Sequence, residues 1–376
     1  MVDPVSLIIP VNYLPMDGRF GAGPSKIRSE QLEALVRISK TYLGTSHRQQ
    51  TVRNEVARLR SGLTQLFSLP EGYEVVLGNG GSTAFWEVAT FGLIQNKAQF
   101  LSFGEFGSKF AASASAAPHL GDQVVIKSDP GEAPKFSAEK GVDTYCTPHN
   151  ETSTGVAVKP YRPNNADEDA LVVIDATSAA GGLDVDLAEL DVYYFSPQKC
   201  FASDGGLWVA IMSPRAINRA FKIKDSGRYI PAFLDLVTAI ENSRLDQTYN
   251  TPGLATIFLM NEQIDWFNQN GGLKWCVERT TKSSSIIYNW VEKSSFAKAY
   301  VANQSNRSSV VATINFSEKV DANQVAKILR QNGIVDVEPY RKLGENQLRI
   351  SVFPSVDPAD VQALTECINF VVENFI

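Results

Sequence analysis

The chain has 376 residues, of which 44% are hydrophobic and 20% are charged; this composition excludes a disordered or fibrous protein and leaves room for two domains. The formal net charge of −6 gives no electrostatic reason to expect nucleic acid or an anionic membrane surface as a partner. Apolar stretches are too short to span a bilayer, and residues 1–15 lack the basic segment of a signal peptide. We therefore expect a cytoplasmic protein.

Helical and β-rich segments alternate through the first two thirds of the chain. Apolar residues at helical spacing predict two helices between residues 29 and 68, on either side of a loop at 43–50. Later, nearly continuous apolar runs predict strands that are covered on both faces. This alternation indicates an α/β domain built on a mainly parallel sheet. The expected strands lie within 73–78, 98–104, 122–128, 143–150, 170–177, 191–196 and 205–213.

The last part of the chain has a different pattern. Two strands, within 308–316 and 347–353, alternate with two helices, within 321–333 and 357–375, which predicts a compact α+β unit. We therefore divide the chain into an N-terminal segment at 1–20, a large domain at 21–262 and a small C-terminal domain at 263–376.

The four cysteines are widely spaced and form no C-x-x-C pair, which argues against a zinc site and against a disulfide framework. We interpret Cys146, Cys200, Cys276 and Cys367 as small core residues.

Lys199 lies just beyond the end of a predicted strand. Ser196 and Pro197 break the aromatic run "VYYF" at 192–195, and Lys199 follows them. Burying an unpaired ammonium costs roughly several kcal/mol. The side chain therefore either extends to solvent or is covalently occupied.

Two other motifs also lie at predicted strand ends. The segment "LGNGGSTAFWEV" (77–88) reads as a strand, a glycine-rich loop and a helix from about Ser82, and the free N–H groups of such a helix start suit a phosphate. Asp175 ends a strand 24 residues before Lys199, about the length of a step between parallel strands. Because ligands bind at the carboxyl ends of parallel strands, we expect Asp175 and Lys199 to face one crevice. Taken alone, the loop is a common turn and Asp175 a common helix cap.

A phosphate cup, a strand-end aspartate and a strand-end lysine together suit pyridoxal 5′-phosphate (PLP). The lysine amine forms a Schiff base with the aldehyde, the aspartate pairs with the protonated pyridine nitrogen, and the helix start takes the phosphate. Phe106 follows another predicted strand and is well placed to cover the ring.

Eight motifs occur in order along nearly the whole chain: "RFGAGPSKI" (19–27), "GTSHR" (44–48), "GNGGSTAFW" (78–86), "PHNETSTG" (148–155), "IDATSAAG" (174–181), "SPQKC" (196–200), "YNTPGLATIF" (249–258) and "LGENQLRISVFP" (343–354). Together they resemble the phosphoserine aminotransferase family, of the class V group within fold-type I PLP enzymes, and most of all its actinobacterial branch.

The resemblance implies a large domain with a mainly parallel seven-stranded sheet, a small α+β domain, and a homodimer with shared active sites. It also implies transfer of the amino group of L-glutamate to 3-phosphohydroxypyruvate, giving O-phospho-L-serine and 2-oxoglutarate in serine biosynthesis. Some relatives also process the phosphorylated hydroxythreonine intermediate of vitamin B6 synthesis, and the sequence does not distinguish them.

The same resemblance implies roles for cofactor-binding residues. Lys199 would be the Schiff-base lysine and proton shuttle, Asp175 would hold the pyridinium nitrogen, and Thr152 would bond the ring 3′-oxygen. Gln198 would contact the phosphate. The phosphate cup would consist of Gly81, Ser82 and Thr83, with Asn250 and Thr251 reaching the phosphate of the neighbouring subunit's cofactor.

Substrate contacts are implied in the same way. Arg349 would clamp the α-carboxylate through its planar fork. His47 and Arg48, from the partner subunit, would meet the substrate phosphate or the glutamate side-chain carboxylate, together with Arg341.

The chain departs from the pattern of many relatives at three places. Phe106 stands where they have a tryptophan over the ring, and Ser82 stands where they have an arginine in the glycine loop. A His-Arg pair near the C-terminal domain appears here as Tyr340-Arg341.

Three other functions remain to be weighed. An alanine–glyoxylate or serine–pyruvate aminotransferase acts on substrates without phosphate and would not need His47 and Arg48 beside Arg349. A cysteine desulfurase would need a mobile catalytic cysteine, and none of the four is well placed. A catalytically silent PLP-fold binding protein would be expected to lose Lys199 or the carboxylate clamp.

Overall fold

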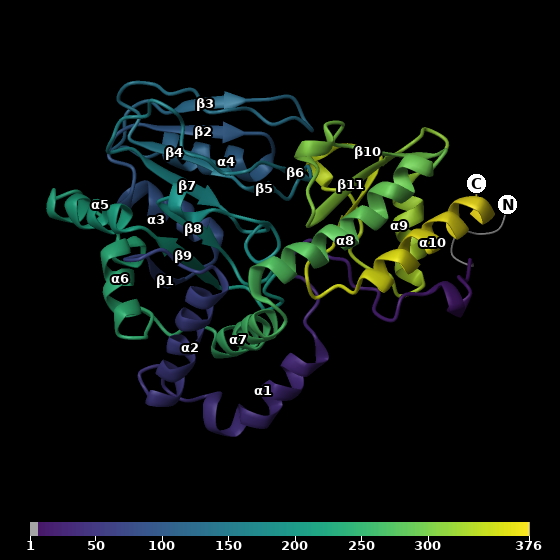
Figure 1. Ribbon diagram of the computed structural model, residues 1–376, viewed down its shortest axis with the longest axis horizontal. Helices are drawn as coiled ribbons and strands as arrows, with labels where there is room; N and C mark the ends of the chain where they lie inside the picture. Colours follow the sequence, from purple (N-terminus) through teal and green to yellow (C-terminus); the bar gives the residue numbers. More distant parts are fainter. Residues whose placement is uncertain (1–6, 376) are drawn as a thin grey trace.

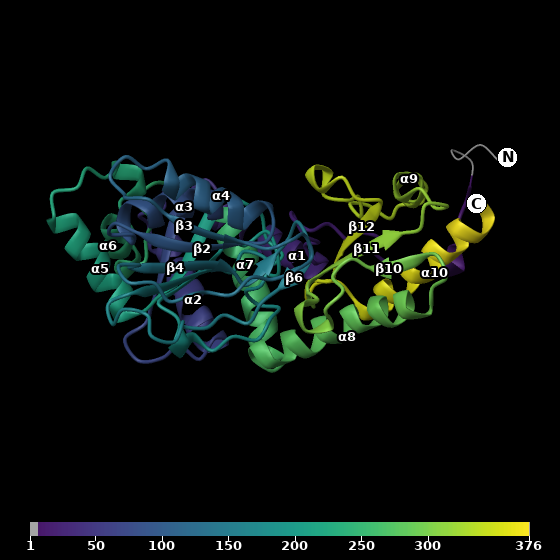
Figure 2. The same cartoon turned by 90° about the horizontal axis from the view of Figure 1, so that it is seen from above.

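The computed structural model describes residues 7–375, and the chain there forms a large lobe and a small lobe side by side (Figure 1, Figure 2). The large lobe is built on a seven-stranded sheet, as predicted. Its strand order is β1-β9-β8-β7-β4-β2-β3. The strands are β1 (Glu74–Asn79), β2 (Ala98–Ser102), β3 (Val124–Lys127), β4 (Thr144–Pro148), β7 (Leu171–Asp175), β8 (Val192–Phe195) and β9 (Leu207–Met212).

Every neighbouring pair from β8 to β3 is parallel, whereas β9 runs antiparallel to both of its neighbours. The reason is the short connection at 196–206, which cannot hold the crossover helix that a parallel return requires. Lys199 lies in this connection.

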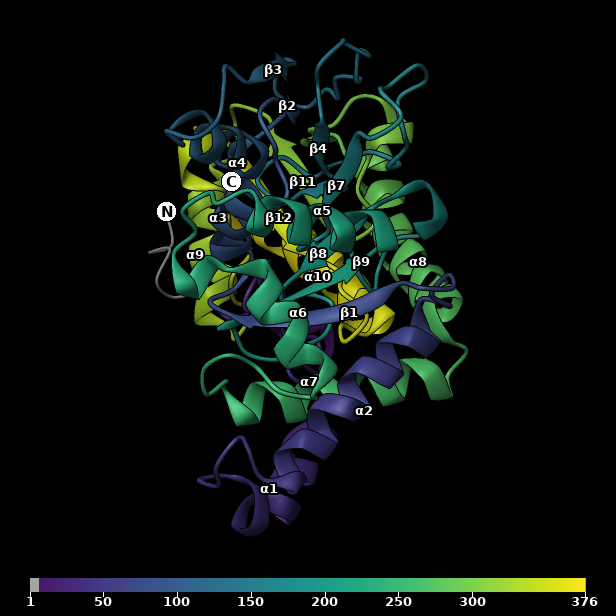
Figure 3. The same cartoon turned by 90° about the vertical axis from the view of Figure 1, so that its left-hand side faces the viewer.

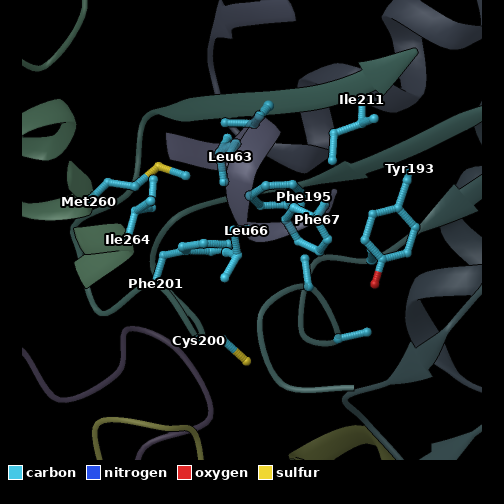
Figure 4. Close-up of a cluster of buried hydrophobic side chains, with 14 of the residues drawn as sticks. Leu63, Leu66, Phe67, Tyr193, Phe195, Cys200, Phe201, Ile211, Met260 and Ile264 are labelled. Atoms are coloured by element: carbon cyan, nitrogen blue, oxygen red, sulfur yellow. The ribbon is translucent and has the colours of Figure 1, made fainter. Parts of the chain in front are cut away.

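Helices cover both faces of the sheet, which explains the continuous apolar strands. On one face, α2 (Gln50–Leu66) and α7 (Leu254–Gln269) pack against alternate strand residues such as Tyr193 and Phe195 (Figure 4). On the other face, Val192 and Tyr194 belong to a second core cluster. That cluster is covered by α3 (Ser82–Gly92), α4 (Glu105–Ser115), α5 (Pro214–Asp225) and α6 (Leu236–Arg244).

The small lobe contains an antiparallel sheet, β10 (Ala297–Ala299), β11 (Val311–Phe316) and β12 (Gln347–Ser351), of which β10 was not predicted. Two of its helices, α9 (Ala322–Gln331) and α10 (Pro358–Phe375), match the sequence prediction. The long helix α8 (Gly272–Lys293) runs from one lobe to the other (Figure 2), with Cys276 in the large-lobe core and Ile287 in the small-lobe core. The domain division at 262/263 stays a prediction.

The remaining elements are short or peripheral. Helix α1 (Ser29–Tyr42) precedes α2 as predicted, and β5 (Asn150–Glu151) pairs with β6 (Val156–Ala157). Short 3-10 turns occur at Val11–Tyr13, Leu187–Glu189, Ala232–Leu234, Gln304–Asn306 and Arg341–Leu343. Between residues 7 and 375, we find no helix with the length and apolar character needed to cross a membrane.

An N-terminal strap, residues 17–25, connects the two lobes. Phe20 N–H donates to the carbonyl of Val335 (3.3 Å), and Ser351 N–H of β12 donates to the carbonyl of Phe20 (3.1 Å). A few residues later, Ser25 N–H donates to the carbonyl of Gln198 (3.0 Å) in the large lobe. The strap therefore joins the small-lobe sheet to the segment that carries Lys199.

Replacing Phe20 should destabilise the protein strongly, because its ring is 0% exposed and packs in the small-lobe core. We expect Phe20→Ala to lower the free energy of unfolding by about 3–5 kcal/mol, measured by urea denaturation at one protein concentration. Met16→Ala is the control, since Met16 is 98% exposed and should change stability by less than about 0.5 kcal/mol. Equal effects of the two variants would show that the strap does not anchor the small lobe.

Candidate active site

The parallel neighbours β7 and β8 bring Asp175 and Lys199 to one cavity of about 200 Å³. Both strands end at the same edge of the sheet, as the sequence predicted for ligand-binding residues. Eight of the predicted site residues line this cavity, namely Gly81, Ser82, Thr83, Phe106, Thr152, Asp175, Gln198 and Lys199. Five lining residues were not predicted: Gly80, Trp86, Asn150, Thr177 and Gly206.

Lys199 is partly buried, and its Nζ donates a hydrogen bond to the carbonyl of Ala22 in the strap. The next strap residue, Gly23, has φ +121°, and a Cβ there would lie 2.2 Å from Lys199 Nζ, so only glycine fits. The pKa of Lys199 is lowered to about 8, mainly by removal of the amine from water and also by the nearby Arg349, while Asp175 opposes the shift. A lysine amine with this pKa is available as a nucleophile near neutral pH.

The Asp175 carboxylate is held by four hydrogen bonds. Trp86 Nε1 (3.2 Å) and Tyr194 Oη (3.0 Å) donate to one oxygen. Thr177 donates its N–H (2.9 Å) and its hydroxyl to the other. This arrangement leaves the carboxylate with a single orientation at the cavity wall. Of these three hydrogen-bond partners of Asp175, only Thr177 had a local pattern that could have revealed it, because it stands two residues after Asp175 as in a side-chain turn. No local pattern marked Trp86.

A cluster of hydroxyl groups surrounds the N-terminus of α3. Ser82 N–H donates to Ser196 Oγ (2.7 Å), and the two serine hydroxyls lie 2.8 Å apart. Ser82 Oγ also lies 2.7 Å from Thr177 Oγ1, which accepts from the serine hydroxyl because its own hydrogen goes to Asp175. Gly81, with φ 79°, caps the helix without a side chain. Together, the helix start and the hydroxyls form a neutral donor-rich cup that suits a phosphate without an arginine.

Three buried polar atoms at or beside the cavity have no hydrogen-bond partner among residues 7–375: Gln198 Oε1, Asn150 Oδ1 and Arg349 Nε. Buried polar atoms are nearly always bonded, so such a group points to a ligand. Arg349 Nη1 donates to the carbonyl of Thr152 (3.3 Å), which places its guanidinium beside the cavity. The lysine, the carboxylate, the donor cup and these unpartnered atoms fit PLP and an anionic substrate.

Comparison with known proteins decides the family. Residues 19–364 match the family profile described as aminotransferase class-V. The chain is 60% identical over 370 residues to the phosphoserine aminotransferase of Nocardioides sp. (98% of this chain, 99% of the relative), and 58% identical over 365 residues to that of Rhodococcus jostii (97% and 98%). It belongs to the phosphoserine aminotransferases of this family.

A solved phosphoserine aminotransferase from Cytophaga hutchinsonii has the same fold, with a TM-score of 0.88 at 23% identity over 96% of this chain and 100% of that chain. The predicted family, fold, enzyme class and PLP cofactor are therefore confirmed. The roles of individual residues stay predictions.

Four predicted residues lie outside the cavity of this aminotransferase, in a cluster of their own: His47, Arg48, Asn250 and Thr251. Thr251 Oγ1 lies 3.0 Å from His47 Nδ1, and Arg48 Nη2 donates to the carbonyl of Tyr249 (3.2 Å). Asn79, at the end of β1, donates to the carbonyl of Thr251 (3.1 Å). The cluster is thus joined to the strand that leads into the glycine loop, but none of its four residues lines the cavity that contains Lys199.

Arg341 also does not line the cavity. Its neighbour Tyr340 does not line the cavity either, but its ring lies 6.1 Å from the Phe106 ring and 5.3 Å from the guanidinium carbon of Arg349. Tyr340 therefore packs between the predicted ring cover, Phe106, and the predicted carboxylate clamp, Arg349.

The lowered pKa of Lys199 predicts a pH-dependent cost to folding in the cofactor-free protein. Between about pH 8 and pH 10.5 the unfolded chain binds more protons at this lysine than the native chain, so native stability rises with pH in this window. Lys199→Met should therefore stabilise the cofactor-free protein at pH 7, by at most about 3 kcal/mol, and much less at pH 10.

Urea denaturation of both chains at the two pH values measures this difference. Lys274→Met, at a lysine whose side chain is 87% exposed, is the matched control and should have a small effect at both. An equal gain for Lys199→Met at pH 7 and pH 10 would contradict the lowered pKa.

Proposed function

We propose that this aminotransferase transfers the amino group of L-glutamate to 3-phosphohydroxypyruvate, giving O-phospho-L-serine and 2-oxoglutarate for serine biosynthesis. The observation that carries the proposal is its identity of 58–60%, over 97–98% of the chain, with relatives named phosphoserine aminotransferase. Two separate cationic side chains support it: Arg349 beside the cavity, and Arg48 in the cluster with His47. A substrate with a carboxylate and a phosphate needs two such groups.

PLP, when bound, supplies the electron sink that makes the α-proton of the amino acid acidic. In this proposal Asp175 compensates the charge on the ring nitrogen, Thr152 donates to the ring 3′-oxygen and Phe106 covers one ring face. The phosphate is held by Gly81, Ser82, Thr83 and Gln198, with Asn250 and Thr251 of a second subunit.

Lys199 is proposed to engage the cofactor aldehyde and then to move the α-proton at its Nζ. A pKa of about 8 suits both tasks, because the amine can gain and lose a proton near neutral pH. Its partner Ala22 is a neutral carbonyl, so the amine can leave this contact without breaking an ion pair.

Arg349 is proposed to bind the α-carboxylate of each substrate. Its Nε is buried without a partner among the described residues, and burial lowers its pKa. A buried cation without an anion is costly, and a bidentate carboxylate would satisfy it. The substrate carboxylate would therefore supply the anion that the Arg349 guanidinium lacks among residues 7–375.

We also propose a homodimer, in which the His47–Arg48 cluster serves the cavity of the other subunit. Helix α1 extends away from the sheet at the edge of the molecule (Figure 3). Val36 of α1 is 72% exposed. Phe233, elsewhere in the chain, is 51% exposed and lies beside Gly80 of the glycine loop. The exposed ring of Phe233 next to the cavity and the exposed Val36 on α1 support an interface on this part of the molecule.

For the location we propose the cytoplasm. The four cysteines are free and buried, a pattern typical of proteins in a reducing compartment.

The reaction is tested by the absorption spectrum of the purified PLP-bound protein while O-phospho-L-serine is added without a keto acid. We expect the visible cofactor band to disappear, and Lys199→Ala to show no turnover. A band that responds only to alanine or serine would favour the alanine–glyoxylate or serine–pyruvate activity instead. If no band forms even with added PLP, a silent binding protein is the better interpretation.

The shared site is tested by mixing two inactive variants, Lys199→Ala and Arg48→Ala, under conditions that exchange subunits. Each mixed dimer would contain one intact site, so activity should recover to at most about a quarter of the native value. As a control, Lys199→Ala mixed with the double variant Lys199→Ala/Arg48→Ala should stay inactive. No recovery in the first mixture would mean that Arg48 does not act across subunits.

A further inference from the structure

Glu151 is a fully buried carboxylate that the proposed function does not use. It stands between Asn150 and Thr152, which both line the cavity, and its relative exposure is 0%. Glu151 itself does not line the cavity, so its side chain points elsewhere than those of its two neighbours. Its carboxylate reaches the start of α4 instead.

Four donors bind the Glu151 carboxylate. Two are the N–H groups of Phe106 (3.1 Å) and Gly107 (3.0 Å), in the first turn of α4. The others are the N–H (3.2 Å) and hydroxyl (2.6 Å) of Ser153. These donors and the positive end of the helix oppose the effect of burial, which raises the pKa of Glu151. Glu151 is thus the cap of a helix that begins 46 residues before it in the sequence.

Gly104, directly before α4, shows that this contact is built into the local structure. It caps the helix without a side chain, and a Cβ at this position would lie 2.3 Å from Glu151 Cγ. Its φ of 174° is open to any residue, so the close approach of Glu151, and not the backbone angle, requires glycine here. Gly104 leaves room for the carboxylate to reach the helix start.

Phe106 is the second residue of α4, and its ring lines the cavity. Its backbone N–H is one of the groups that Glu151 binds, so the carboxylate fixes the point from which the ring extends. We propose that Glu151 is a positioning residue for the cofactor: it fixes the start of α4 so that Phe106 covers the PLP ring. This inference rests on the proposed role of Phe106.

The tripeptide 150–152 thereby connects two walls of the cavity. Asn150 and Thr152 form one wall, while Glu151 holds the helix that brings Phe106 to the other. A change at Glu151 should alter cofactor binding without touching any cofactor-binding side chain directly.

The test uses the full chain with Glu151→Gln, which keeps the side-chain shape but replaces one acceptor oxygen by an amide donor. We expect the dissociation constant for PLP to rise by roughly three- to tenfold, the loss that one aromatic stacking contact carries. The visible circular dichroism of the bound cofactor should also decrease. In a Phe106→Ala background, Glu151→Gln should have no further effect on PLP binding, because the two residues act through the same contact.

Asp235→Asn is the matched control. Asp235 is also a buried carboxylate at a helix N-terminus, where it accepts hydrogen bonds from Val237 and Thr238 of α6, outside the cavity. We expect it to lower the melting temperature while leaving PLP affinity and circular dichroism unchanged.

Two outcomes would overturn the inference. In the first, Glu151→Gln behaves like Asp235→Asn, with lower stability and native PLP binding; Glu151 would then be only a structural cap. In the second, the effect of Glu151→Gln on PLP binding adds in full to that of Phe106→Ala, so the two residues act independently. If Phe106→Ala alone binds PLP like the native chain, the predicted ring cover is wrong and this inference falls with it, while the roles of Lys199 and Asp175 are unaffected.

Discussion

The burial of one amine, Lys199 Nζ, is the constraint on which the site depends. The amine lies at the edge where β7 and β8 end, next to Ala22 and Gly23 of the N-terminal strap. Removing it from water lowers its pKa to about 8 and so gives it the reactivity of an amine near neutral pH. The strap that encloses it is hydrogen-bonded to the small-lobe sheet, so both lobes contribute to this environment.

The same edge of the sheet explains why the cavity of the large lobe lies next to the small lobe. Parallel strands deliver their carboxyl ends to one side, and the short link after β8 turns back there because it cannot hold a helix. Arg349 comes from β12 of the small lobe and contacts Thr152 of the large lobe. Tyr340 packs between Arg349 and Phe106. A movement of one lobe would therefore shift the predicted carboxylate clamp relative to the predicted ring cover.

Several residues that shape the site carried no signal in the sequence. Trp86 donates to Asp175 across 89 residues of chain, and Glu151 caps a helix that begins 46 residues earlier. Such contacts join segments that meet only after the sheet and its helices have packed. Local patterns cannot reveal them, because the same tryptophan or glutamate would read as an ordinary core or surface residue. His47 and Thr251 were predicted as site residues, but their contact was not, since it joins positions 204 residues apart.

By itself, the sequence determined the alternation of helices and strands, the mainly parallel sheet and the strand-end positions of Asp175 and Lys199. These follow from apolar periodicity and from turn residues, which act over a few neighbouring positions. Only the tertiary structure decided which helix Glu151 caps, which side chains hold Asp175, and that Tyr340 rather than Arg341 lies beside the site. The physical reason is that burial and hydrogen-bond partners depend on packing between distant segments, and this packing is settled only when the chain is folded.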